Sequence, residues 1–233
     1  MVFVVSGDNV LTAWKAGAQY LLDANEHRTR NLITEISNPT ITDSIWFKKY
    51  DPKSVGAIDS LSVVAKVLFP SVWSQQEHLR EKFYQNWIDT LKRGRRLKRL
   101  RSSWGSTYFE RLVSIDGSDN QIERAIRVLS TWQRKEAAIV MHLSAPRIDR
   151  LKPIGSPCLQ YIEILWGRDG TIDLVAVYRN HDFLKKALGN FIGLGRILDF
   201  IAEHSDKKPG RIVCHSVHAY TDAPNKLKQL ISK

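Results

Sequence analysis

Two short segments bring together residue types that could attack an anionic substrate. Pro157-Cys158-Leu159-Gln160 places a cysteine at the entrance to strand-like sequence, and Tyr178-Arg179-Asn180-His181-Asp182 follows a second such stretch. A cysteine attacks as its thiolate, and an arginine beside it would lower the pKa of the thiol from its ordinary value of about 8.5. Arg179 could also hold a phosphate through two parallel hydrogen bonds. The opposing interpretation is that Cys158 is an inert core residue, as most free cysteines are.

A predicted β-hairpin would bring the two segments together. Residues 161–166 and 171–178 are rich in apolar residues, and Gly167-Arg168-Asp169-Gly170 between them is typical of a tight turn. Because the two strands of a hairpin are antiparallel, the end of the second strand would place Arg179 beside Cys158 at the start of the first.

The other predicted elements give a mixed layout of helices and strands. Spacing of apolar residues every three to four positions predicts helices, and alternating or continuous apolar stretches predict strands. The predicted helices are residues 9–24, 60–69, 71–100, 120–132 and 183–204, and the further strands are 30–37, 137–141 and 211–215. No internal repeat or low-complexity linker interrupts the order. We therefore expect an α+β fold in a single domain over residues 1–233.

Composition restricts the class of protein. The chain has 233 residues, of which 43% are hydrophobic, and it has two cysteines, which is too few for a disulfide framework. No Cys/His cluster has the spacing of a zinc site, so we expect no metal. The apolar run at residues 1–5 has no basic leader, and no apolar stretch approaches the roughly 18 residues of a membrane span. We expect a cytoplasmic protein without a membrane partner. Its net charge of +11 favours an anionic partner.

Residues 157–220 as a whole resemble the thymidylate synthase family. P-C-L-Q is similar to the family's nucleophile motif, and Y-R-N-H-D is similar to its arginine-serine-x-aspartate stretch. The resemblance implies that Cys158 is the reactive cysteine, that Arg179 holds the nucleotide phosphate beside it, and that Asn190 reads the pyrimidine edge. Gln160 and Asn180, in the same motifs, are further candidates for substrate contacts.

The resemblance also assigns the sugar and folate contacts. His218 and Tyr220, in the segment H-S-V-H-A-Y, fall on the pair that contacts the sugar hydroxyl. Asp182 falls on the aspartate that meets the pterin, and Trp87 is a second candidate for binding the folate.

Upstream segments extend the similarity to nearly the whole chain. Tyr108-Phe109-Glu110-Arg111-Leu112 is similar to the family's tyrosine-glycine-x-arginine-leucine signature, which makes Tyr108 a further catalytic candidate. Arg28 or Arg30 matches an N-terminal arginine that binds phosphate. Arg134 and Lys135 match a pair that reaches the partner subunit's phosphate across a dimer.

The chemistry implied by the resemblance is one-carbon transfer to carbon 5 of a pyrimidine nucleotide, either methylation or hydroxymethylation, with the conversion of dUMP to dTMP favoured. Addition of the thiolate to carbon 6 makes carbon 5 of the ring nucleophilic, so that it can attack a one-carbon unit supplied by 5,10-methylenetetrahydrofolate. The asparagine amide offers both a donor and an acceptor, which fits uracil. The implied assembly is a homodimer that uses a face of the sheet and shares its phosphate sites.

Other features keep different functions open. If residues 62–69 align with the family helix that supplies a catalytic glutamate, Lys66 takes its place, which would leave a protein that binds a nucleotide without methyl transfer. A shift in register would bring Asp59 nearer, and Lys66 is equally well a surface lysine. The basic run at residues 92–101 could be a solvated helix end, a guide for a polyglutamylated folate, a surface for an acidic partner, or a nucleic-acid contact through Arg95, Arg96 and Arg99. Nucleic acid is not the favoured partner.

Overall fold

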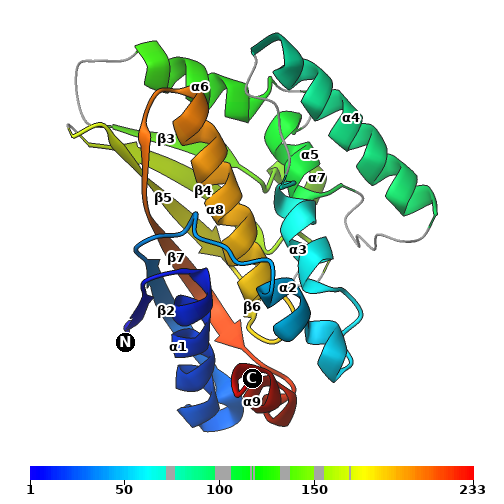
Figure 1. The fold of residues 1–233 in the computed structure, drawn as a ribbon, viewed down its shortest axis with the longest axis vertical. Helices are drawn as coiled ribbons and strands as arrows, with labels where there is room; N and C mark the ends of the chain where they lie inside the picture. Colours follow the sequence, from blue (N-terminus) through cyan, green and yellow to red (C-terminus); the bar gives the residue numbers. More distant parts are fainter. Residues whose placement is uncertain are drawn as a thin grey trace.

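In the computed structural model, helices pack against a mixed β-sheet (Figure 1). The structure describes residues 1–71, 77–97, 106–115, 117, 119–131, 137–149, 155–167 and 169–233. The strands are β1 (Phe3–Gly7), β2 (Arg28–Ile36), β3 (Ala137–His142), β4 (Leu159–Trp166), β5 (Thr171–Tyr178), β6 (His181–Asp182) and β7 (Lys208–Tyr220). The helices are α1 (Val10–Asp23), α2 (Trp46–Lys49), α3 (Leu61–Leu68), α4 (Glu77–Arg96), α5 (Tyr108–Val113), α6 (Gln121–Thr131), α7 (Pro146–Asp149), α8 (Ala187–His204) and α9 (Pro224–Ile231), with 3-10 turns at Asn25–His27 and Pro52–Val55.

Strand directions decide which residues meet at each end of the sheet. The strand order is β1-β2-β7-β5-β4-β3, with β6 paired to β7 outside this path. β4 is antiparallel to β5, β5 is parallel to β7, and β2 is antiparallel to β7. The starts of β2 and β4 therefore lie at the same end of the sheet as the ends of β5 and β7. We call this the Cys158 end, because Cys158 directly precedes β4.

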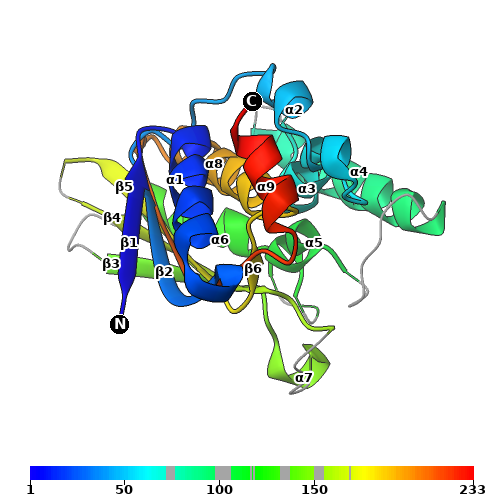
Figure 2. The same ribbon diagram turned by 90° about the horizontal axis from the view of Figure 1, so that it is seen from below.

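The two faces of the sheet differ in their covering. The longer helices gather on one side of the strands (Figure 2). Alternate side chains of β5, Ile172, Leu174, Ala176 and Tyr178, are fully buried, as expected for a strand with one face toward the core. The opposite face carries exposed apolar side chains, which are Val4, Val140, Leu165 and Val217. We call it the uncovered face.

Close packing of α3 on α8 fixes the start of α8 relative to the sheet. A β-carbon added to Gly189 would lie 2.6 Å from Val64 Cγ1, and one added to Gly193 would lie 2.8 Å from Leu68 Cβ. Two glycines one helical turn apart therefore let the helices approach more closely than larger residues would allow. Asn190, next to the first of these glycines, is held in the same packed turn.

The structure confirms most of the predicted elements within the described residues. Helices occupy the described parts of all five predicted segments, and the predicted hairpin is formed by β4 and β5. The last strand is longer than predicted, because β7 continues through Tyr220 to pair with the start of β2. The sequence interpretation did not include β1, β6 or α9. No helix in the described residues has both the length and the apolar character needed to cross a bilayer.

Candidate active site

The Cys158 end of the sheet collects most of the predicted site residues. Cys158 precedes β4, while Arg179 and Asn180 follow β5. His218 and Tyr220 lie at the end of β7, paired in register with Arg30 and Arg28 at the start of β2. Residues distant in the sequence thus reach one place through strand pairing alone.

Tyr108 holds the backbone of the candidate nucleophile. Its hydroxyl oxygen accepts hydrogen bonds from the backbone N–H groups of Cys158 and Leu159, each at 3.3 Å. The tyrosine opens α5, whose start is capped by Thr107 and Glu110 in a capping box. Burial raises the pKa of Tyr108 well above its usual range, so the hydroxyl keeps its proton at neutral pH.

Arg179 and Gln160 hold the segment that leads to Cys158. The Arg179 guanidinium donates to the carbonyl oxygens of Pro157 at 3.1 Å and Ser156 at 3.0 Å, and Gln160 Nε2 donates to the Pro157 carbonyl at 2.6 Å. The backbone N–H of Arg179 donates to the Cys158 carbonyl at 2.8 Å. The predicted proximity of Arg179 and Cys158 is therefore confirmed, and part of the guanidinium is used to shape the loop.

The electrostatic balance at the thiol differs from the expectation. Burial raises the pKa of Cys158, and the nearby charges of Arg179 and Lys186 lower it without offsetting the burial. The predicted effect of Arg179 has the right sign, but the prediction of a thiol with a lowered pKa is wrong for the protein without substrate. The cause is the loss of water around a half-buried sulfur, which disfavours the charged form.

Asn190 lies at the end of a buried row of hydrogen bonds. Its Nδ2 is 3.1 Å from His181 Nε2, and His181 Nδ1 is 2.8 Å from Ser216 Oγ. All three residues are buried. Sequence reasoning missed the roles of His181 and Ser216, because their contact joins strands β6 and β7 across 35 positions of the sequence.

The predicted sugar and phosphate residues form a second group at the same end. Asn180 Oδ1 accepts a hydrogen bond from His218 Nδ1 at 3.0 Å, and the rings of His218 and Tyr220 stack at 5.1 Å. Burial and the charges of Arg28 and Arg30 lower the pKa of His218, so both guanidinium groups act on this ring. Burial raises the pKa of Tyr220 to about 12, with contributions from Asp182, Asp222 and Cys158.

The two predicted folate contacts lie in different surroundings. Asp182 Oδ1 accepts from the backbone N–H groups of Leu184 and Lys185, each at 3.0 Å, and its Oδ2 pairs with the half-exposed Lys185 ammonium at 3.2 Å. A ligand donor could displace that lysine and use Oδ2. Trp87 lies on α4, and within the described chain its buried Nε1 has no hydrogen-bond partner. An unpartnered buried donor of this kind is available to a ligand group that reaches it.

The structure places Lys66 on α3. That lysine is exposed, while Leu61, Val64, Ala65 and Leu68 form the buried face of α3. Asp59, just before the helix, instead pairs with Lys186 Nζ at 2.6 Å. Through this pair, Asp59 is linked to a cation whose charge acts on Cys158.

The basic candidates divide into described and undescribed residues. Arg134 and Lys135 lie outside the described residues, as do residues 98–101 of the basic run. Arg95 Nη2 donates to Glu110 Oε1 at 2.6 Å, so it is engaged in holding the start of α5. A nucleic-acid contact through the run would therefore have to do without Arg95.

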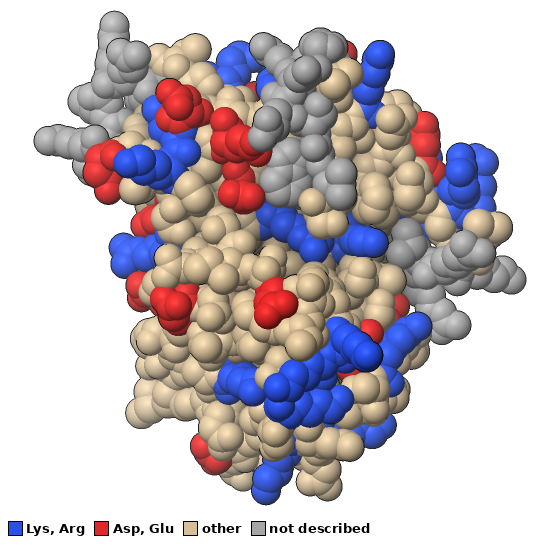
Figure 3. All heavy atoms as spheres, in the orientation of Figure 1, with Lys and Arg blue, Asp and Glu red and all other residues tan. Residues whose placement is uncertain are grey.

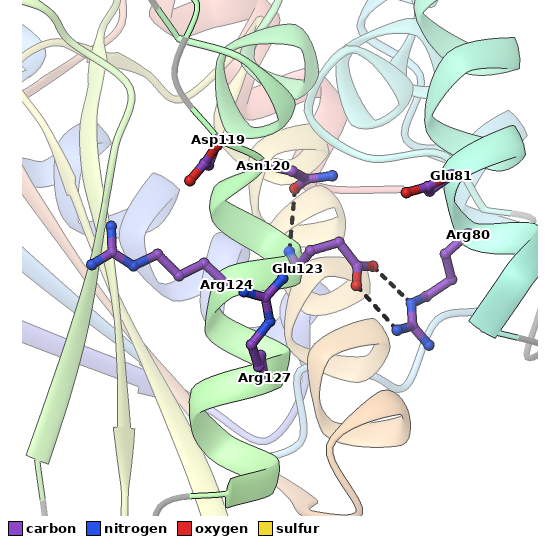
Figure 4. Close-up of a pocket in the computed structure, with 7 residues that line it drawn as sticks. All are labelled: Arg80, Glu81, Asp119, Asn120, Glu123, Arg124 and Arg127. Carbon is purple, nitrogen blue, oxygen red and sulfur yellow. Dashed lines mark hydrogen bonds and ion pairs between the residues drawn. The ribbon is translucent and has the colours of Figure 1, made fainter.

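A separate hollow between α4 and α6 contains none of the predicted site residues (Figure 4). Arg80 and Glu123 form an ion pair there at 2.7 Å, and the Tyr84 hydroxyl donates to the same carboxylate. Asn120 accepts from the backbone N–H of Glu123 at the start of α6. These groups satisfy one another and join α4 to α6.

Positive side chains also gather near α2 (Figure 3). The ammonium groups of Lys15 and Lys49 lie 4.8 and 5.4 Å from the ring centre of Tyr50. Part of the net positive charge is thus concentrated on one surface. Among the described residues, no group of three or more His, Cys, Asp or Glu side chains is placed to hold a metal.

Fold and site together define a protein with a mixed sheet, helices on one of its faces, and a cysteine flanked by a tyrosine and an arginine at one sheet end. No protein-family model matches the sequence. A Methanococcoides burtonii protein named "Putative thymidylate synthase" is 31% identical over 130 residues, which are 54% of this chain and 57% of that protein.

Relatives with the same name occur in other archaea. The Methanosarcina barkeri protein is 30% identical over 114 residues, 49% of this chain and 51% of its own length. The Methanothermobacter thermautotrophicus protein is 28% identical over 114 residues, 49% of this chain and 50% of its own length. The chain thus spans about half the length of the curated relatives it matches. It is related to the thymidylate synthase family, as the motifs predict.

Proposed function

We propose that this protein transfers a one-carbon unit from 5,10-methylenetetrahydrofolate to carbon 5 of a pyrimidine nucleotide, converting dUMP to dTMP. The observation that carries the proposal is the position of Cys158, with its backbone N–H bonded to the Tyr108 hydroxyl and its preceding loop held by Arg179. The names of the archaeal relatives support the same reaction class.

Cys158 begins the proposed reaction by adding its sulfur to carbon 6 of the ring. The ring then carries negative charge toward carbon 5 and its neighbouring carbonyl, which makes carbon 5 a nucleophile. Arg179 and Lys186 favour the thiolate that this step requires, since both lower the pKa of Cys158. Polar groups of a bound nucleotide beside the sulfur would reduce the effect of burial, which opposes the effect of these two cations on the pKa.

The other predicted residues would hold the nucleotide. Arg28, Arg30 and Arg179 supply positive charge for the phosphate at the Cys158 end of the sheet. The stacked pair His218 and Tyr220 would meet the sugar hydroxyl. Asn190 would face the pyrimidine, and Gln160 and Asn180 would line the sides of the nucleotide site.

Reduced folate would supply the one-carbon unit as a co-substrate. Asp182 has one carboxylate oxygen whose lysine partner is half-exposed, which suits a contact with a pterin N–H group. The proposed setting is a reducing cytosol, where Cys158 remains a thiol.

A second candidate function is nucleotide binding without methyl transfer. The observation that favours it is the raised pKa of the Cys158 thiol, because a protonated sulfur is a poor nucleophile. In this case nucleotide would bind but no carbon unit would be transferred.

We also propose that the protein is a homodimer formed through the uncovered face. Val175 and Val213 are paired neighbours on its central strands β5 and β7, and further apolar side chains are exposed around them. Exposed apolar patches on a sheet commonly mark protein interfaces. The shared phosphate sites would draw on Arg134 and Lys135 of the second copy. Val175→Asp should convert the dimer to a monomer in light scattering, whereas Lys66→Asp, on an exposed helix position, should not.

Tritium release tests the proposed reaction directly. Nucleotides labelled with tritium at carbon 5 (dUMP, dCMP, UMP and CMP) are incubated with methylenetetrahydrofolate, and the products are identified by mass spectrometry. Release with dUMP, and its loss in Cys158→Ala, is the expected result, while Cys214→Ala should retain it because Cys214 is fully buried. Absence of release with all four nucleotides would refute the reaction. Binding of dUMP without release would favour the second candidate.

A further inference from the structure

Three side chains form a buried row of hydrogen bonds that ends at Asn190. Ser216 Oγ lies 2.8 Å from His181 Nδ1, and His181 Nε2 lies 3.1 Å from Asn190 Nδ2. Ser216 is fully buried, and His181 and Asn190 are 1% and 5% exposed. Water has little access to these groups, so their hydrogen bonds must be matched within the row.

The His181 ring is fixed in position and in charge. It stacks on Tyr178 with ring centres 4.2 Å apart and an angle of 4° between the planes. The rings of Phe183 and Phe191 meet it edge to face. Burial lowers the pKa of His181 to about 3, so the ring is neutral at physiological pH and carries one N–H.

Because the ring is neutral, each hydrogen bond in the row has a defined donor and acceptor. The Asn190 amide nitrogen carries hydrogens and cannot accept, so the neutral ring must accept from it at Nε2. The single N–H of the ring is then on Nδ1, where it donates to Ser216 Oγ. The Asn190 oxygen is thereby turned to the other side of the amide.

We propose that Ser216 and His181 fix which way round the Asn190 amide lies, and that this orientation makes the site select a uracil-type base over a cytosine-type base. The inference rests on the proposed function, in which Asn190 faces the pyrimidine. Both residues are positioning residues, because they act on the base through Asn190.

The selection follows from the edges of the two bases. With Nδ2 directed to His181, Asn190 still presents its second N–H beside its carbonyl oxygen. A uracil offers a carbonyl oxygen and a ring N–H to this pair, whereas a cytosine offers an amino group and a bare ring nitrogen. Cys158 and the phosphate fix how the ring lies, so only rotation of the amide would fit cytosine. The row opposes that rotation, since it would place the amide oxygen against the acceptor nitrogen of His181.

Removing either positioning residue should weaken the selection. Dissociation constants of dUMP and dCMP are measured by calorimetry without folate for the unmodified protein, Ser216→Ala and His181→Phe. Ser216→Ala frees the imidazole to place its hydrogen on Nε2, and His181→Phe keeps the stacked ring while removing both nitrogens. We expect the unmodified protein to prefer dUMP. The ratio of the two constants should fall about tenfold in each variant, which corresponds to roughly 1.4 kcal/mol.

The test includes a control variant and a result that would overturn the inference. His215→Ala changes the neighbouring residue on the other face of β7, where His215 contacts Asn31, and it should leave the ratio unchanged. Equal weakening of both nucleotides in Ser216→Ala and His181→Phe would overturn the inference, because a purely structural role acts on both bases alike. Should His181→Phe fail to fold, Ser216→Ala decides alone. Failure of the unmodified protein to bind either nucleotide would instead remove the proposed function and this inference with it.

Discussion

The Tyr108 hydroxyl lies 3.3 Å from the backbone nitrogen of Cys158 and accepts its hydrogen bond, together with that of Leu159. The start of α5 and the start of β4, which are distant in the sequence, are thereby linked through one oxygen atom. The backbone of the candidate nucleophile is held independently of the thiol.

Tyr108→Phe should therefore affect both stability and activity. Two partly buried N–H groups lose their acceptor, which costs about 1–3 kcal/mol of the free energy of unfolding. The nucleophile backbone is freed at the same time, so tritium release should fall as well. Urea denaturation measures the first effect. Tyr84→Phe removes a hydroxyl bound to Glu123 and should lower stability without changing tritium release; an equal loss of release in both variants would contradict the role of Tyr108.

Alkylation of Cys158 should report the electrostatic balance at the sulfur. Because burial raises the pKa of this thiol, its rate with iodoacetamide should still be rising above pH 8.5 or so, the ordinary pKa of cysteine. Arg179→Gln and Lys186→Met each remove a cation that lowers this pKa, so each should move the midpoint to higher pH. Lys185→Met, a neighbour paired with Asp182, is the control. Cys214 will not interfere, since burial raises its pKa to about 12.

Loss of the buried ion pair of Arg111 and Asp149 should lower the free energy of unfolding more than loss of a half-exposed ion pair. Their atoms Nη2 and Oδ1 are 2.7 Å apart, and the side chains are only 3% and 5% exposed. Asp149→Asn removes the negative charge beside a buried guanidinium and should cost about 3–5 kcal/mol in urea denaturation. Asp173→Asn breaks the half-exposed pair with Arg211 and should cost less than about 1 kcal/mol. Similar losses in the two variants would count against this assignment.

The parts of the fold that sequence patterns predicted are those with local signals. Helix spacing located the segment of α8, and the apolar stretches around Gly167 and Gly170 located the hairpin of β4 and β5. By contrast, α9 has only two buried residues, Leu227 and Leu230, which is too weak a periodicity to stand out. The extension of β7 depends on pairing with β2, which lies far away in the sequence.

The candidate site likewise has features that the sequence indicates and features that depend on the folded structure. Cys158, Arg179 and Asn190 were identified from residue types and a family resemblance. The role of His181 depends on Ser216, which reaches it only through the pairing of β5, β6 and β7. The raised pKa of Cys158 depends on burial, which spacing does not reveal.

His181 should also give the protein an acid-sensitive component of stability. Its folded pKa, lowered by burial to about 3, lies below the value of about 6.5 expected for an unfolded chain. Between these two pH values the unfolded state binds more protons, so the free energy of unfolding rises with pH. This contribution is complete above pH 6.5 or so and is lost as the pH falls toward 3, by at most about 1.4 kcal/mol per pH unit. His181→Phe should flatten the pH dependence of urea denaturation between about pH 6.5 and 4, where the described carboxylates with lowered pKa values contribute little. A slope unchanged in His181→Phe would mean that the imidazole takes up protons equally in the folded and unfolded states, so that burial does not keep the folded ring neutral.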